Sequence, residues 1–169
     1  LATDERQALA FFAAGLREVS APPVDRGELL YNASVLAHYA LLSTRTPVDW
    51  PAPADLGAVF DHFVWSDTLR RDPAMMEAAG AQCLLLAGLF EDQMRRRHNI
   101  RWYSTLGSGF FSRAAAAQPA DPRAQLLGQL AQHFEAWHQR HARLSRELRD
   151  QAYVLHTPPR DVPGTTAEE

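Results

Sequence analysis

The sequence contains no lysine, so all 17 of its basic side chains are arginines. Against them stand 20 acidic residues, which leaves a formal net charge of −3 over 169 residues. Nucleic-acid-binding proteins draw most of their affinity from a basic surface. The charge balance therefore argues against a nucleic-acid partner, and the arginine bias is better explained by a GC-rich genome.

Cysteine is almost absent too, since Cys83 is the only one. No disulfide can form within the chain, and a thiol inside an apolar run is typical of core packing rather than of a nucleophile. A lone thiol fits a reducing compartment, so we expect a cytoplasmic protein. The first residues, LATDERQALAFF, place acidic side chains ahead of the apolar stretch, and we expect no secretion signal there.

Long apolar runs are missing as well. The longest are residues 35–42, interrupted by His38, and residues 83–90. Both are far shorter than the roughly 20 residues that span a bilayer, so we expect a soluble protein with no membrane span. No segment alternates between apolar and polar residues strictly enough to predict a strand. The sequence therefore predicts an all-α protein, and its length fits one domain with its own core.

Prolines, capping residues and apolar spacing divide the chain into five or six helices. We expect them over residues 3–20, 25–43, 55–71, 73–98 and 110–117, and for about thirty residues from Pro122. The WYSTLGSG segment should form a turn, with Ser108 capping the helix that follows. The bundle domain covers residues 1–156, and residues 157–169 form an extended tail, because TPPRDVPGTTAEE cannot build a core.

Two of these helices are apolar on nearly all sides, over residues 29–42 and 79–90, and we expect them at the centre of the bundle. We expect Leu86 and Phe90 to be fully buried. The long C-terminal helix carries a heptad seam. The seam residues are Leu127, Leu130, Phe134, Trp137, His141, Leu144, Leu148 and Leu155. Such a seam either packs along a helix of the same chain, which we favour, or pairs with a second subunit.

Several polar side chains fall in apolar surroundings and are candidate ligand-binding residues. His38 lies among apolar neighbours and should be buried, and His141 occupies a seam position. His141 is either a core histidine with a hydrogen-bond partner or a pH-sensitive element, and we expect the neutral form to be buried. If they converge, Tyr31, Asn32, His38 and His141 could line a ligand pocket between helices.

Seven histidines suggest a metal site, but their spacing does not favour one. His133 lies roughly 140° around the helix from His138, so the two cannot bind one ion. Glu135 and His138 form a Glu-x-x-His unit, which di-iron bundles use in pairs, and the chain has only one copy. We expect no metal and no cofactor. A metal site, if there were one, would comprise Glu135, His138 and His141.

The segment RRRHNIR, followed by Trp102 and Tyr103, mixes cations with aromatic rings. Such a mixture could contact RNA or an acidic partner, or it could be a solvated helix end with the aromatic rings packed beneath it, which we favour. The candidate interaction residues are Arg95, Arg96, Arg97, Trp102 and Tyr103.

The stretches AGAQCLLLAGLF and RRRHNIRWYSTLGSGFFSRAA, within residues 79–115, resemble a pattern of helical bacterial proteins without an assigned activity. In that pattern an apolar helix ends in Gly-Leu/Phe-Phe and is followed by an arginine cluster, an aromatic pair and Leu-Gly before another aromatic residue. The matching residues are Gly88, Leu89, Phe90, Arg95, Arg96, Arg97, Trp102, Tyr103, Leu106, Gly107 and Phe111. The resemblance implies a helical cytoplasmic protein and brings no activity, ligand or catalytic residue.

The sequence thus favours a non-catalytic interaction or regulatory module that binds a protein partner or forms a homodimer through exposed parts of its last helix. The alternative is a helical bundle that binds a small ligand or metal and could be an enzyme. The two hypotheses differ in one structural expectation. Only the alternative requires a polar cavity lined by Tyr31, Asn32, His38 or the histidines of the seam.

Overall fold

The computed structural model describes residues 3–45, 72–96 and 99–155, and this part of the chain contains helices and no strands. The all-α class is confirmed. The helices are α1 (Thr3–Glu18), α2 (Arg26–Arg45), α4 (Pro73–Ala87), α5 (Glu91–Met94), α6 (Ile100–Ala116), α7 (Pro122–Gln132) and α8 (Phe134–Leu155). The helix expected over residues 55–71 and the tail lie outside the described residues. None of the described helices is long and apolar enough to cross a membrane.

Three aspartates fix the helix starts that the sequence predicts. Asp72 accepts hydrogen bonds from the backbone N–H groups of Ala74 and Met75, and a proline opens α4. Asp121 caps α7 in the same way, again with a proline in the first turn. Asp25 accepts the backbone N–H of Glu28 at 2.9 Å. Each side chain satisfies donors that the first helical turn leaves unpaired, so the breaks at the proline-containing loops are local in origin.

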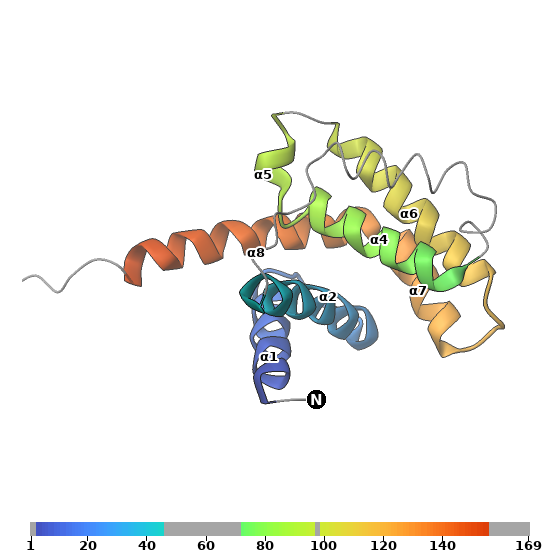
Figure 1. Ribbon diagram of the computed structural model, residues 1–169, viewed down its shortest axis with the longest axis horizontal. Helices are drawn as coiled ribbons and strands as arrows, with labels where there is room; N and C mark the ends of the chain where they lie inside the picture. Colours follow the sequence, from blue (N-terminus) through green and yellow to red (C-terminus); the bar gives the residue numbers. More distant parts are fainter. Residues whose placement is uncertain (1–2, 46–71, 97–98, 156–169) are drawn as a thin grey trace, which may run out of the picture.

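The helices form two packed groups around α8 (Figure 1). In one group α1 packs against α2, and in the other α6 packs against both α4 and α7. Helix α8 contacts α1, α4, α6 and α7, and its outer end extends beyond the other helices (Figure 1). The start of α8 therefore joins the two groups.

Only one of the two expected central helices is central. Residues 83–87 of α4 are all buried. By contrast, α2 exposes a stripe that includes Leu30, Ser34 and His38, spaced four residues apart on one side of the helix. The expectation for α2 was wrong, because this helix has one buried side and one exposed side, although its sequence is apolar almost throughout. The inner half of α8 takes the central place instead.

The helix expected to continue to His98 ends at Ala87. A Cβ atom on Gly88 would lie 2.5 Å from His141 Cβ and 2.9 Å from the His138 carbonyl oxygen, so a larger residue would collide with α8. The chain turns there, and Ser145 Oγ donates a hydrogen bond to the Leu89 carbonyl at 2.9 Å. The four-residue helix α5 follows.

The prediction of a turn at WYSTLGSG is also wrong, because α6 continues without a break through Gly107, Ser108 and Gly109. A Cβ atom on Gly107 would lie 2.3 Å from Phe134 Cζ and 2.8 Å from Cys83 Cβ. Ser108 Oγ donates to the Ala131 carbonyl at 2.8 Å. The small residues therefore permit close helix packing and a contact with α7, rather than a break in the helix.

The helix expected from Pro122 is interrupted at His133, which separates α7 from α8. The seam is nevertheless confirmed within the chain, because its residues from Leu127 to Leu144 are buried. Leu148 is half-buried against the core, and the side chain of Leu155 lies outside the described residues.

Leu86 is 3 % exposed, as expected, whereas Phe90 is only half-buried because it follows the end of α4. Replacing Leu86 with alanine leaves a cavity, and Leu86→Ala should lower the free energy of unfolding by about 2 to 5 kcal/mol in denaturant melts. Leu30→Ala on exposed α2 surface is the matched control and should cost less than about 1 kcal/mol. Equal losses for the two variants would contradict the assignment of Leu86 to the core.

Candidate functional site

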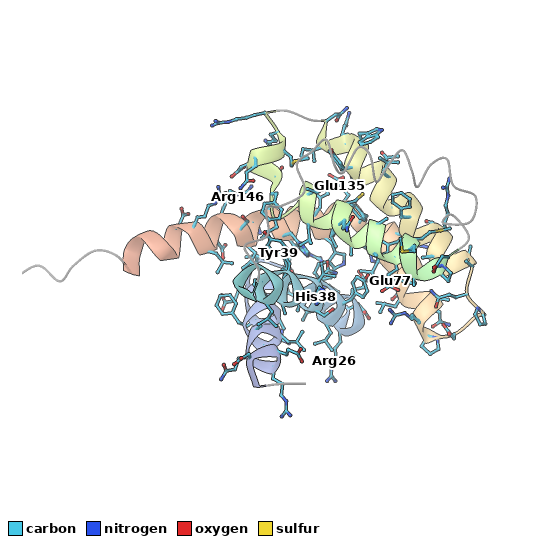
Figure 2. All side chains as sticks on the ribbon, in the orientation of Figure 1. Arg26, His38, Tyr39, Glu77, Glu135 and Arg146 are labelled. Atoms are coloured by element: carbon cyan, nitrogen blue, oxygen red, sulfur yellow. The ribbon has the colours of Figure 1, made fainter. Side chains whose placement is uncertain are left out.

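The four expected ligand residues lie in two separate environments. Tyr31 and His38 line a groove of about 510 Å³ between α2, α4 and α7. Figure 2 labels His38 and Tyr39 of α2 and Glu77 of α4, which all belong to its lining. Asn32 and His141 are fully buried in the core. His38 is exposed rather than buried, because it belongs to the outer stripe of α2. The four side chains therefore do not line one pocket.

Within the groove, Tyr31, Glu77 and Arg123 contact one another. Arg123 Nη2 donates to both oxygens of Glu77, at 2.8 and 2.9 Å. Burial raises the pKa of the Tyr31 hydroxyl, and the neighbouring Glu77 carboxylate raises it further. These pairs connect α2, α4 and α7 and give the groove a structural role.

In the core, His141 and Asn32 form a hydrogen-bonded pair. His141 Nε2 lies 2.9 Å from Asn32 Oδ1, and Asn32 Nδ2 donates to the Glu28 carbonyl at 2.8 Å. Because Asn32 Oδ1 is an acceptor, Nε2 of His141 carries the proton. Burial and the nearby His138 lower the pKa of His141 to about 3. The expected buried neutral form therefore agrees with the geometry.

The residues named for a metal site are only partly together. Glu135 Oε2 lies 3.0 Å from His138 Nε2, while His141 is directed toward Asn32. Within residues 3–45, 72–96 and 99–155, no three His, Cys, Asp or Glu side chains are grouped to hold an ion. The arrangement of Glu135 and His138 is an acid–imidazole pair rather than a ligand set.

The candidate interaction residues do not form one surface either. Arg95 pairs with Glu91 of α5, whereas Arg96 is exposed. Trp102 is 49 % exposed, but Tyr103 belongs to the core, with its ring edge-on to Trp102. Arg97 lies outside the described residues.

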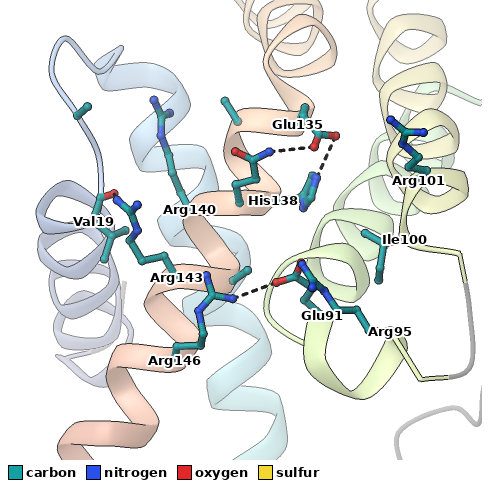
Figure 3. Close-up of a pocket in the computed structure, with 14 residues that line it drawn as sticks. Val19, Glu91, Arg95, Ile100, Arg101, Glu135, His138, Arg140, Arg143 and Arg146 are labelled. Carbon is teal, nitrogen blue, oxygen red and sulfur yellow. Dashed lines mark hydrogen bonds and ion pairs between the residues drawn. The ribbon is translucent and has the colours of Figure 1, made fainter.

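A feature that sequence reasoning missed is a cleft of about 670 Å³ between α8, α5, the start of α6 and the loop after α1 (Figure 3). We call it the arginine cleft. It is lined by five arginines and two glutamates, a formal excess of three positive charges on a chain that is negative overall. The charged lining residues are Arg95, Arg101, Arg140, Arg143, Arg146, Glu91 and Glu135.

The arginines of α8 are held in place by protein contacts. Arg143 Nη1 donates to the Val19 carbonyl at 3.1 Å, and the Arg140 guanidinium carbon lies 4.4 Å from the centre of the Trp137 ring. Partial burial lowers the pKa of Arg140, with an opposing effect from Glu28. These contacts fix the side chains, while their remaining N–H groups can still donate to a ligand.

At one end of the cleft, Glu91 joins α5 to α8. Its carboxylate accepts Arg95 Nε at 2.9 Å and Arg146 Nη1 at 3.1 Å. Glu91 is only 7 % exposed, so its charge is compensated by these two guanidinium groups. Arg149 of α8 adds a second ion pair to the same short helix, with Asp92.

His138 lines the cleft between Glu135 and α5 (Figure 3). The residue is 4 % exposed, and neither ring nitrogen has a well-aligned hydrogen-bond partner among the described residues. The 3.0 Å approach of Glu135 to Nε2 is close enough for an ion pair, but it lacks hydrogen-bond geometry. Buried polar atoms without partners are uncommon in folded proteins and mark places where a ligand or water completes the set.

The Glu135 side chain lines the cleft on its solvent-exposed side. Its Oε2 accepts Ser104 Oγ at 2.9 Å, and its Oε1 accepts Gln139 Nε2 at 2.9 Å. Burial alone would raise the pKa of Glu135, but the hydrogen bond from Ser104 and the nearby His138 outweigh it, and the pKa is lowered. Glu135 is therefore ionised at neutral pH.

The same contacts bear on nucleophilic catalysis. Ser104 Oγ donates its hydrogen bond to the Glu135 carboxylate and not to His138. Cys83 is buried at the contact between α4 and α6, and burial raises the pKa of its thiol to about 12. A thiol in this environment is not an activated nucleophile.

Comparison of the chain with protein-family models, with curated proteins and with solved structures finds no significant match. The class of protein that the structure supports is an all-α protein with an arginine-lined cleft.

The buried His141 predicts a pH-dependent stability. Its folded pKa of about 3 lies below the unfolded value of about 6.5, so the stabilising neutral form is lost as pH falls through the unfolded value. Between pH 7 and pH 5 the wild type should lose about 2 kcal/mol more unfolding free energy than His141→Leu, by the linkage of protonation to folding. Parallel pH profiles in denaturant melts would contradict the burial of His141.

Proposed function

We propose that this protein is a non-catalytic binding module whose ligand is a small anion with phosphate, sulfate or carboxylate groups. The observation that carries the proposal is the arginine cleft, which five arginines line together with a buried imidazole whose ring nitrogens lack aligned partners. Guanidinium groups bind such anions through paired N–H donors. The volume of the cleft, about 670 Å³, fits a small molecule.

A non-catalytic role is supported by the state of the single cysteine. The Cys83 thiol lies in the core, and burial raises its pKa. The module would therefore act by binding, as a regulatory or sensing protein does. We place it in the cytoplasm, because its single cysteine is a buried free thiol, which fits a reducing compartment.

Self-association is a second candidate function. The outer end of α8 extends beyond the other helices (Figure 1). Leu148, four residues after the buried Leu144, continues the apolar seam toward that end and is half-buried. A second copy of the chain could cover this part of the seam, as in a coiled coil.

The anion-binding proposal is tested by calorimetric titration with inorganic phosphate, sulfate and citrate at constant ionic strength. At least one of these anions should bind wild type, and Arg101→Gln should weaken that binding about tenfold, because it removes a charge-assisted donor. The Arg101 guanidinium lines the cleft without a partner among the described residues. Arg113→Gln, on the exposed side of the same helix, is the matched control and should leave affinity unchanged.

Binding of none of the three anions to wild type would contradict the proposal. An equal loss of affinity in Arg101→Gln and Arg113→Gln would also contradict it, because the anions would then respond to overall charge and not to the cleft.

Self-association predicts a molar mass of twice the 18.9 kDa of the chain, measured by light scattering during size-exclusion chromatography. Leu148→Glu should then shift the mass toward that of one chain, because a charge on the seam opposes pairing. A single-chain mass for wild type at every concentration would contradict this second candidate.

A further inference from the structure

We infer that the arginine cleft selects phosphomonoesters over sulfate, because Glu135 favours a bound anion that can also donate a hydrogen bond. This inference rests on the proposed function. The arginines alone would accept either anion. The selection comes from one acidic side chain placed among them.

Glu135 is available to a ligand. It lines the cleft beside His138, and its side chain is 64 % exposed. Ser104 and Gln139 each donate one hydrogen bond to the carboxylate, and His138 Nε2 lies 3.0 Å from Oε2. An ionised carboxylate offers about four lone-pair directions, so acceptor capacity remains on the exposed side.

The two contacts from Ser104 and Gln139 also fix the orientation of the carboxylate. Ser104 lies on α6 and Gln139 lies one turn further along α8, so the carboxylate is held from both helices. An anion attracted by Arg101 and Arg140 therefore approaches a carboxylate that is negatively charged and held in place.

Sulfate and phosphomonoesters interact differently with the Glu135 carboxylate. Sulfate near neutral pH has only acceptor oxygens, so its contact with Glu135 is repulsive. A phosphomonoester has a second pKa near about 6 and carries one proton in a large part of its population at that pH. Its O–H group can donate to Glu135 while its remaining oxygens accept from the arginines, which converts a repulsive contact into a charge-assisted hydrogen bond.

The size of the site indicates an organic phosphomonoester rather than phosphate alone. The cleft volume of about 670 Å³ lies in the range for small-molecule ligands and exceeds what one phosphate group fills. Ile100 and Ala142 supply apolar lining beside the charged groups, where the organic part of the ligand can pack.

The test is calorimetric titration of the whole chain at about pH 6 and constant ionic strength with four probes: inorganic phosphate, methyl phosphate, dimethyl phosphate and sulfate. Dimethyl phosphate matches the charge of singly protonated methyl phosphate but has no proton to donate. Phosphate and methyl phosphate should bind about tenfold or more tightly than dimethyl phosphate and sulfate, the difference expected of one hydrogen bond to a charged group.

Glu135→Gln removes the negative charge and keeps an acceptor for Ser104. In this variant sulfate and dimethyl phosphate should bind within about threefold of phosphate, because the repulsion is gone. Glu147→Gln, an exposed residue of α8 outside the cleft, is the matched control and should keep the wild-type order. Circular dichroism of both variants checks that the helices are intact.

Equal binding of all four probes to wild type would overturn the selection of phosphomonoesters and leave the anion-binding function standing. A wild-type preference that survives Glu135→Gln would overturn the role of Glu135. If none of the probes binds and citrate does, the selection is wrong and the proposed function stands. If citrate fails as well, the proposed function itself is wrong.

Discussion

Inside the core, Glu28 of α2 places its carboxylate against the start of α8, and the relation between the two helix groups depends on this contact. Trp137 Nε1 donates to Glu28 Oε2, and His133 Nδ1 lies 2.9 Å from Oε1. One turn along each helix, Asn32 accepts from His141. Glu28 is 3 % exposed, so moving α2 away from α8 would leave a buried charge without partners. The polar contacts therefore set how α2 lies against α8.

The position of α8 in turn produces the arginine cleft. Trp137 and His141 face the core, and Arg140, Arg143 and Arg146, three residues apart, line the cleft beside them, with Arg140 stacked on the Trp137 ring. Across from them, α5 starts where Gly88 ends α4 against α8. The close approach that shortens α4 thus also places Glu91 within reach of Arg146. The core and the cleft are two sides of one helix, so substitutions that shift its rotation would change both.

Sequence reasoning predicted those features that depend on neighbouring residues. The caps at Asp25 and Asp72 and the helix start at Pro122 are local, and the seam through Trp137 follows from helical periodicity. It failed where a distant helix decides the outcome. Gly107 reads as a turn residue in the sequence, yet its hydrogen atom makes room for the Phe134 ring, which lies 27 residues further along the chain.

The candidate site was harder to predict for the same reason. The spacing of Arg140, Arg143 and Arg146 could have indicated a basic face on α8, but not that Arg95, just after α5, and Arg101 of α6 would approach it. Glu135 and His138 were named as a pair from their spacing, and they are close together. The residues that surround this pair depend on how distant helices pack, and the local sequence does not determine that packing.

The burial of Cys83 gives the protein an internal reporter. Its sulfur is the only thiol in the chain, it is 2 % exposed, and it lies where α4 meets α6. A thiol-directed reagent can reach it only when those two helices separate, and a thiolate forms readily only once the sulfur meets water. The rate of labelling at one atom therefore measures how often the centre of the molecule opens under native conditions, without any engineered probe.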